Sequence, residues 1–142
     1  MRIADVLKAK GAAVTTTTPD TSVAAFLAGL VDRNIGAMVV VGPDGPVGIV
    51  SERDVVHKLH ELGTDLLTRP VSEIMTKHLV FCSPDDSVDS LSAAMTHNRV
   101  RHIPVISDGR LAGIVSIGDV VKTRMQELES STEHLQAYIT QG

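Results

Sequence analysis

The sequence predicts a mixed α/β (α+β) protein in which two β-α-β-β-α repeats pack through their sheets with pseudo-twofold symmetry. Blocks of the first half recur in the second half in the same order; Pro19, for example, recurs as Pro84, 65 positions later. Each half also places an Asp-Gly turn between two apolar runs, which is a strong signal for a β-hairpin. Because a unit of about 60 residues buries little core by itself, we expect the two repeats to share one.

The recurring blocks indicate where the repeats begin and end. They pair Ile3–Leu7 with Val71–Met75, Pro19–Val23 with Pro84–Val88, Gly48–Ser51 with Gly113–Ser116, and Asp54–Val56 with Asp119–Val121. Their order predicts a first domain at residues 1–63, a linker at residues 64–70 and a second domain at residues 71–128. Residues 129–142 carry Leu135, Tyr138 and Ile139. We expect them to form a helical tail, a last short helix that either caps the module or meets a partner.

In the first half, the predicted elements follow from spacing and turn residues. Apolar residues between Val23 and Val31 fall at helical intervals, and a Thr or Ser after Pro19-Asp20 provides a helix N-cap. The elements in order are a lead-in helix at Ile3–Lys10, a strand at Val14–Thr16, a helix containing Val23, Phe26, Leu27, Leu30 and Val31, strands at Ile35–Val41 and Val47–Val50, and a helix at Glu52–Leu62.

The second half repeats this order. Its predicted elements are a lead-in helix at Val71–Thr76, a strand at Val80–Cys82, a helix containing Val88, Leu91, Ala94 and Met95, strands at Val100–Ile106 and Leu111–Val115, and a helix at Ile117–Glu129. The turns between the paired strands are Pro43–Pro46 and Ser107–Arg110, and both contain Asp-Gly.

Composition excludes several classes of partner. The chain has a net charge of -4 and only three aromatic residues, two Phe and one Tyr. Nucleic-acid-binding surfaces usually need a basic patch, and single-strand binders add stacking aromatics, so we expect no nucleic acid. No apolar signal region and no run of roughly 20 apolar residues is present, so we expect a cytoplasmic protein without membrane contact. The single cysteine, Cys82, is expected to be a small buried hydrophobe.

The sequence lacks the patterns that catalysis would need. There is no Gly-x-x-x-x-Gly-Lys phosphate loop, no His-Glu-x-x-His and no nucleophile paired with a base at a recognised spacing. His57 and His60 lie at i, i+3 on a predicted helix and could form half of a metal site, but no third ligand can be placed beside them. We therefore expect neither an enzyme nor a catalytic cofactor nor a metal site.

A Ser-x-x-Asp pattern opens the last predicted helix of each half. Ser51 precedes Asp54, and Ser116 precedes Asp119. This pattern matches a capping box, which needs no ligand. It also favours ligand binding, because a helix N-terminus attracts phosphate and a carboxylate can accept two hydrogen bonds from a vicinal diol. The two roles are compatible, and the sequence leaves both open.

The ordered blocks, together with Arg101-His102-Ile103-Pro104-Val105, resemble a tandem pair of cystathionine-β-synthase (CBS) domains, often called a Bateman module. The resemblance extends from Ile3 to about Met125. It implies a regulatory module that binds an adenosyl ligand such as AMP, ADP, ATP, NAD(H) or S-adenosylmethionine in the clefts between its domains. It also implies a homodimer, formed through exposed faces of the two final helices, and an unknown regulated protein. The alternative is a ligand-free scaffold that mediates dimerisation or partner binding.

The resemblance also assigns roles to residues. In the family, the aspartates equivalent to Asp54 and Asp119 bind the ribose hydroxyls, and the serines equivalent to Ser51 and Ser116 contact ribose or phosphate. Two further roles follow from the resemblance: Arg101 and His102 for phosphate, and Thr76 for the space near the base. Independently of the resemblance, Arg53 and Lys122 flank the two helix N-termini and could add positive charge there.

Simpler roles stay open for several of these residues. Arg101 could be a solvated strand residue, His102 a half-buried histidine, Lys122 the partner of a surface acid and Thr76 the end of a helix. The first half has Gly36 and Ala37 where the second has Arg101 and His102. We therefore expect two unequal clefts. Arg101, His102 and Lys122 near one cleft would favour a ligand with at least one phosphate over S-adenosylmethionine.

Overall fold

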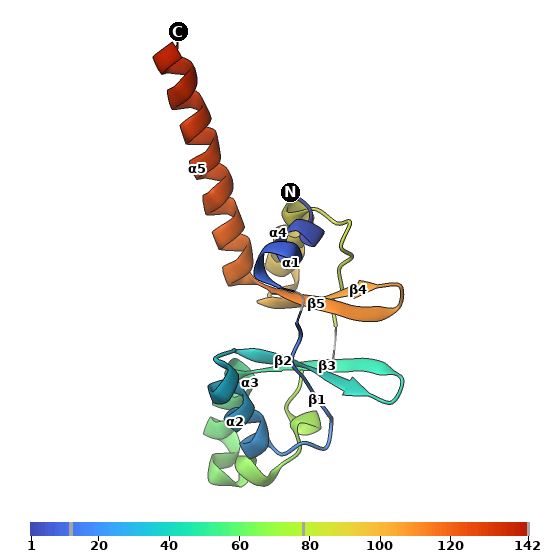
Figure 1. The fold of residues 1–142 in the computed structure, drawn as a ribbon. Helices are drawn as coiled ribbons and strands as arrows, with labels where there is room; N and C mark the ends of the chain where they lie inside the picture. Colours follow the sequence, from blue (N-terminus) through green and yellow to red (C-terminus); the bar gives the residue numbers. More distant parts are fainter. Residues whose placement is uncertain (12, 78, 142) are drawn as a thin grey trace.

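The computed structural model describes residues 1–11, 13–77 and 79–141. It contains two sheets that face each other, with helices on their outer sides (Figure 1). One sheet has the strand order β1 (Thr16–Thr17), β2 (Ala37–Gly42), β3 (Gly45–Ser51), and the other pairs β4 (His102–Ser107) with β5 (Arg110–Ser116). This arrangement confirms the predicted mixed fold of two repeats packed through their sheets.

Both predicted hairpins are present, and they have equivalent registers. Val39 lies opposite Ile49 in the first sheet, and Pro104 lies opposite Ile114 in the second. Each hairpin has an irregularity at the same repeat position, between residues 40 and 41 and between residues 105 and 106. The turn between β4 and β5 uses Asp108 and Gly109, both at positive φ. Two central residues at positive φ match the twist of a tight hairpin.

The helices lie close to their predicted positions, with differences at the lead-in segments. They are α1 (Ile3–Lys10), α2 (Val23–Arg33), α3 (Glu52–Leu62), α4 (Val88–Asn98) and α5 (Ile117–Gln141), with short 3-10 segments η1 (Gly63–Thr68) and η2 (Val71–Glu73). The lead-in helix predicted at residues 71–76 shortens to one turn, because Thr76 pairs with β3 instead. The strand predicted at residues 80–82 reduces to a bridge between Cys82 and Val105.

The structure has two hydrophobic cores, one beside each sheet, so the expectation of a single shared core is wrong. The lead-in segments are exchanged between these two cores. Helix α1 belongs to the first repeat, yet its Ile3 and Leu7 pack in the core of the second. Val71, from the second repeat, packs in the core of the first. Backbone bonds support the exchange: Ile3 N donates to Asp86 O at 2.9 Å, and Val71 N donates to Thr21 O at 2.8 Å. The sequence repeats are therefore interlocked and do not coincide with the packing units.

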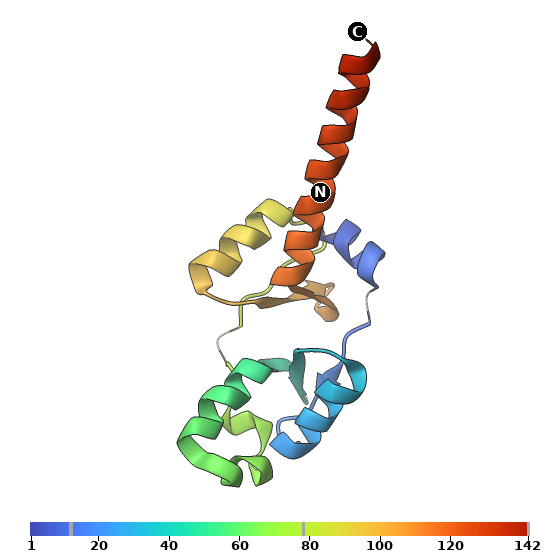
Figure 2. The ribbon, with the colours of Figure 1, turned by 90° about the vertical axis from the view of Figure 1, so that its left-hand side faces the viewer.

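Helix α5 is longer than predicted. It continues as one helix to Gln141, so the separate short helix expected after Glu129 is wrong. No proline interrupts residues 117–141, and Gly118 lies in the first turn, so nothing in the sequence stops the helix. Its second half projects away from the rest of the molecule (Figure 2). Within the part of the chain that the structure describes, no helix has both the length and the apolarity needed to cross a bilayer.

Candidate functional site

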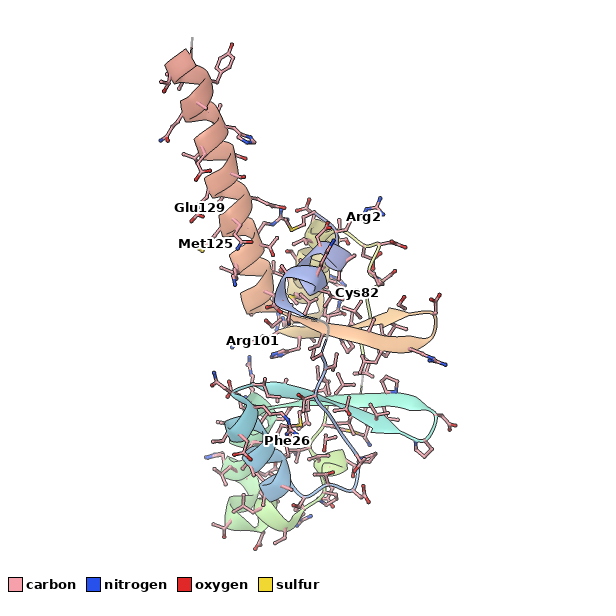
Figure 3. The ribbon with its side chains drawn as sticks, viewed as in Figure 1. Arg2, Phe26, Cys82, Arg101, Met125 and Glu129 are labelled. Carbon is pink, nitrogen blue, oxygen red and sulfur yellow. The ribbon has the colours of Figure 1, made fainter. Side chains whose placement is uncertain are left out.

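A cleft of about 340 Å³ opens between the two repeats, within the size range of small-molecule sites. Its walls come from the end of β3, the start of α3, the segment after η2 and the start of β4. The lining residues are Gly36, Ile49, Ser51, Glu52, Arg53, Asp54, Thr76, Leu79, Val80, Arg99, Val100, Arg101, His102 and Pro104. Figure 3 shows Arg101 at the edge of the second repeat that faces the first.

One end of the cleft is the capped N-terminus of α3. Ser51 N donates to Asp54 Oδ2 at 2.8 Å, and Asp54 N donates to Ser51 Oγ at 3.4 Å, so the capping box is present. Among the described residues, the hydrogen bonds to the Asp54 carboxylate all reach Oδ2. Oδ1 is therefore open to a further donor. Capping and ligand binding are compatible at this residue.

The floor of the cleft forms where the backbone at Thr76 lies close against strand β3. Thr76 N donates to Ile49 O at 2.8 Å, and Ile49 N donates to Thr76 O at 3.0 Å. This pairing brings the chain against Gly48, where a Cβ atom would lie only 2.6 Å from Met75 Sδ and 3.0 Å from Thr76 O. The glycine of the first Gly-Ile-Val-Ser block is thus required by packing. Ile49 and Val80, which line the cleft, offer an apolar surface beside Thr76.

The charged side chains of the cleft nearly balance. Arg53, Arg99 and Arg101 face Glu52 and Asp54, a formal sum of three positive and two negative charges. Sequence reasoning missed Arg99, which has φ 54° just after α4. Its repeat counterpart is Asn34, which has φ 51°. Comparing these two positions could have identified Arg99 as a candidate. The left-handed conformation suits asparagine better than arginine, so an arginine at this position suggests a functional role.

His102 is a poor carrier of positive charge in this cleft. Burial lowers the pKa of His102, and the nearby Lys10 ammonium lowers it further. The imidazole is therefore mostly neutral at pH 7, when it offers one donor and one acceptor. Arg101 and its neighbouring arginines are left as the cationic groups of the cleft.

The corresponding place in the second repeat is occupied by a lysine. Ser116 N donates to Asp119 Oδ2 at 2.9 Å, so the cap is the same as in the first repeat. Lys10, from α1, also donates to Asp119 Oδ2 at 2.6 Å and to Ile114 O at 2.8 Å. Because Ile114 is the repeat counterpart of Ile49, the Lys10 ammonium replaces the backbone N–H that Thr76 supplies in the first repeat.

The pairing of Lys10 with Asp119 is partly protected from solvent. The Lys10 and Asp119 side chains are 31% and 20% exposed. Burial raises the pKa of Asp119, but the hydrogen bonds from Lys10 and from Ser116 N outweigh it, so that the pKa is lower than usual. Asp119 therefore stays ionised and paired with Lys10. Sequence reasoning missed Lys10, since the exchange of α1 between the cores is invisible in the repeat pattern.

The structure divides the residues expected to bind ligand into three places. The cleft lining includes Ser51, Arg53, Asp54, Thr76, Arg101 and His102. Ser116 and Asp119 lie together beneath Lys10. Lys122 is separate from both groups and lines an exposed hollow on α5 with Val121 and Met125. The expectation that Lys122 would lie near Arg101 and His102 is therefore wrong, because α5 turns this side chain outward.

The remaining candidate side chains offer little chemistry. Cys82 is half-buried, and its Sγ donates to Pro104 O at 3.6 Å. Burial raises the pKa of Cys82 to about 12, so the group is a thiol at neutral pH. No group of three or more His, Cys, Asp or Glu side chains that could hold a metal ion is found within residues 1–11, 13–77 and 79–141.

Sequence and structure comparisons identify similar proteins. The CBS domain family matches residues 4–61 and 71–125. The CBS-domain containing protein ATU1752 of Agrobacterium tumefaciens has 42% sequence identity and a TM-score of 0.84, covering 87% of this chain and 99% of that one. The mitochondrial CBS domain-containing protein CBSX3 of Arabidopsis thaliana is 37% identical over 149 residues, 99% of this chain and 72% of the plant protein.

A more distant similarity concerns a structure with bound ligands. The CBS domain pair of protein MJ0100, solved in complex with methylthioadenosine and S-adenosylmethionine, has a TM-score of 0.78 and 22% sequence identity. The similarity covers 89% of this chain and 98% of that one. At this level of identity, what the two proteins share is the fold.

Proposed function

Because this chain belongs to the CBS domain family as a tandem pair of such domains, we propose that it is a regulatory module that binds an adenine nucleotide without turning it over. The observation that carries the proposal is the cleft itself. It combines an open carboxylate at a helix N-terminus, Asp54, with apolar surface and three arginines. Such a combination suits a ligand with a diol, a flat base and a phosphate.

The proposed binding mode uses each part of the cleft for one part of the ligand. The Asp54 carboxylate accepts hydrogen bonds from the two ribose hydroxyls. The base packs on the apolar side near Ile49, Thr76 and Val80. The phosphate is bound by Arg101, with Arg53 or Arg99 beside it, because a guanidinium can bind phosphate oxygens in a bidentate manner.

The charge balance favours a ligand with a single phosphate, such as AMP. Three arginines against Glu52 and Asp54 leave one net positive charge when His102 is neutral. This is less than ATP would need, since desolvated charges without partners are costly. The ligands named for the MJ0100 pair are adenosyl compounds without phosphate. They support a ligand of the adenosyl class, and the arginines that line the cleft of this chain support a ligand that also carries a phosphate.

We propose one ligand per chain. The Asp119 carboxylate accepts from the Lys10 ammonium at 2.6 Å, so a ribose at that place would compete with an ion pair that Asp54 does not have. Asp54 has no such competitor among the described residues. The two equivalent carboxylates are thus expected to differ in affinity although their caps are alike.

Regulation would follow from the position of the ligand between the repeats. A nucleotide that touches α3 of the first repeat and β4 of the second favours one relative arrangement of the two, provided that it binds that arrangement more tightly. A partner protein would read the change. We further propose a homodimer in the cytoplasm, formed through exposed apolar residues such as Val56 and Leu59 of α3 and Val121 of α5.

The test is isothermal titration calorimetry of protein freed of co-purified nucleotide, with AMP, ATP, NADH and S-adenosylmethionine as titrants and adenosine as the control without phosphate. The proposal predicts saturable binding of AMP at one site per chain, and weaker binding of adenosine. No heat from any titrant, with a folded sample, would contradict ligand binding. That result would favour the alternative of a ligand-free scaffold.

A further inference from the structure

Helix α5 exposes an apolar stripe along its whole length. Ile117, Val121, Met125, Leu128, Leu135 and Ile139 are 49%, 51%, 57%, 67%, 63% and 74% exposed. Figure 3 shows Met125 on the side of α5 turned away from α1 and α4. Isolated apolar residues on a surface are ordinary, but a continuous row on one helix marks a contact surface.

The spacing of the stripe is that of a coiled coil. Val121, Met125, Leu128, Thr132, Leu135 and Ile139 alternate at intervals of four and three residues. In heptad terms, Met125, Thr132 and Ile139 are at a positions, and Val121, Leu128 and Leu135 are at d positions. With Gly118 at the first a position, the pattern runs for about three heptads, the length at which it begins to indicate a coiled coil.

The outer half of α5 is exposed on all sides in the single chain. Val120 and Thr123 are buried against the module, and Glu127 is the last half-buried residue of the helix. Every residue from Leu128 to Thr140 is exposed. A solvated helix of that length is marginal in water, because most helical stability in proteins comes from packing of an apolar face.

We propose that α5 pairs in register and in parallel with α5 of a second copy of this chain, as a two-stranded coiled coil. This inference rests on the proposed homodimer and extends its surface from α3 and the start of α5 to the whole length of α5. Leucines occupy the d positions of the projecting heptads, Leu128 and Leu135, while the a positions hold the β-branched Thr132 and Ile139. In parallel coiled coils, Ile or Val at a with Leu at d favours two strands, and Ile139 with Leu135 fits this pattern.

Charge at the edges of the stripe agrees with a parallel pair. Arg124 is at a g position and Glu129 at the following e position, so each arginine would face the partner's Glu129. Arg124 already pairs with Asp89 and Glu127. Glu129 forms no ion pair among the described residues and is exposed, beside Met125 in Figure 3. The second copy thus offers a positive partner to a free carboxylate.

Sedimentation velocity of the full chain tests the pairing. Leu128→Asp with Leu135→Asp places like charges face to face in the stripe, and we expect the dimer dissociation constant to rise at least about 100-fold. The matched control is Ser130→Asp with Ala137→Asp, which adds the same charge to the opposite, f-position face of α5. We expect the control to change the constant by less than about 3-fold. Circular dichroism and AMP titration of both variants verify that the module is folded.

A cross-linking experiment tests the orientation without disturbing the leucines. In a Cys82→Ser background, Ile139→Cys should form a disulfide between chains on mild oxidation, since a parallel pair brings this position next to its own counterpart. Ala137→Cys, on the opposite face, should not. A wild-type chain that is monomeric would overturn the homodimer and the coil together. A dimer unaffected by the two aspartates, or a cross-link through Ala137→Cys only, would overturn the coil and leave dimerisation through α3.

Discussion

The last helix of each repeat begins with the same capping box, yet the two repeats offer different surfaces to a ligand. Ser51 and Ser116 occupy equivalent positions, and each donates its backbone N–H to the aspartate three residues later, at 2.8 and 2.9 Å. The carboxylate of the first repeat lies open in a cleft, whereas that of the second holds Lys10. Local sequence therefore determines the cap, and a distant element determines whether the cap can bind.

The difference arises from what the lead-in segments bring to each hairpin. In the first repeat, Thr76 pairs with Ile49 through its backbone, which leaves Asp54 free. In the second, α1 reaches the same place with a lysine side chain, which binds Ile114 O and continues to Asp119. One exchanged segment thus forms the floor of the cleft, and the other brings a lysine onto the carboxylate of the second repeat.

The largest expected effect comes from removing the open carboxylate. Asp54→Asn keeps a side chain that can still accept the hydrogen bond from Ser51 N, but it removes the charge proposed to bind the ribose diol. We expect AMP affinity to fall about 100-fold, because hydrogen bonds to a charged group contribute roughly 1.5–3 kcal/mol each. Asp119→Asn is the matched control and should change affinity less than about 3-fold. Calorimetry of both variants measures the contrast, and equal losses would refute the distinction between the clefts.

A smaller effect is expected from the arginine across the cleft. Arg101→Ala removes the proposed charge-assisted contact to phosphate, so we expect AMP binding to weaken by roughly 10-fold. Adenosine binding should be almost unchanged in the same variant, since adenosine has no phosphate. Competition titrations with both ligands give the comparison. An equal loss for adenosine would mean that Arg101 shapes the cleft and does not bind phosphate.

Lys10→Met tests whether the lysine prevents a nucleotide from binding at Asp119. Methionine has a similar length but cannot pair with Asp119, so the carboxylate should become available and the stoichiometry should rise from about one toward two nucleotides per chain. The second site is expected to be the weaker, because Arg101 and His102 line the first cleft. If the stoichiometry stays at one while Asp119 is free, something other than Lys10 excludes the ligand.

The same pair predicts a dependence of stability on pH. The pKa of Asp119 is lower in the folded protein than in the unfolded chain, so its contribution is present above the unfolded value, near 4, and is lost as the pH falls through the folded value. Lys10→Met removes the contact that does most to lower the pKa of Asp119. Urea unfolding between pH 6 and 3 should therefore show a shallower loss of stability for the variant. If the free energy of unfolding falls equally steeply with pH in both proteins, Lys10 does not stabilise the ionised Asp119 carboxylate.

A still smaller effect is expected at His102, which lines the cleft and lies near the charge of Lys10. Burial is the main reason that its pKa is low, and the Lys10 charge is the second. In Lys10→Met we expect the His102 pKa to rise, while staying below the usual value near 6.5 because the side chain remains half-buried. An NMR titration of the imidazole protons measures it. An unchanged pKa would mean that the ammonium is too well solvated to act on His102.

The local features of the fold could be predicted from the sequence. Asp-Gly turns between apolar runs predicted both hairpins, and the Ser-x-x-Asp pattern predicted caps that the structure confirms. Both signals depend on residues within a few positions of one another, where backbone geometry limits the choices. For the same reason α3 begins and ends at its predicted residues, Glu52 and Leu62.

Features that depend on distant contacts could not be predicted. Lys10 and Asp119 are far apart in the chain, and only the exchange of α1 brings them together. Lys122 lies one turn after Asp119, but its direction depends on which face of α5 packs on the sheet. The short lead-in after Pro70 looked helical by repeat analogy, whereas pairing with Ile49 ends it early.

The most direct test of the central claim is a crystal structure of the chain grown with AMP. We expect one nucleotide per chain, with both ribose hydroxyls on Asp54, the phosphate on Arg101, and Lys10 still bonded to Asp119. A nucleotide at Asp119 with Lys10 displaced, and none at Asp54, would contradict it.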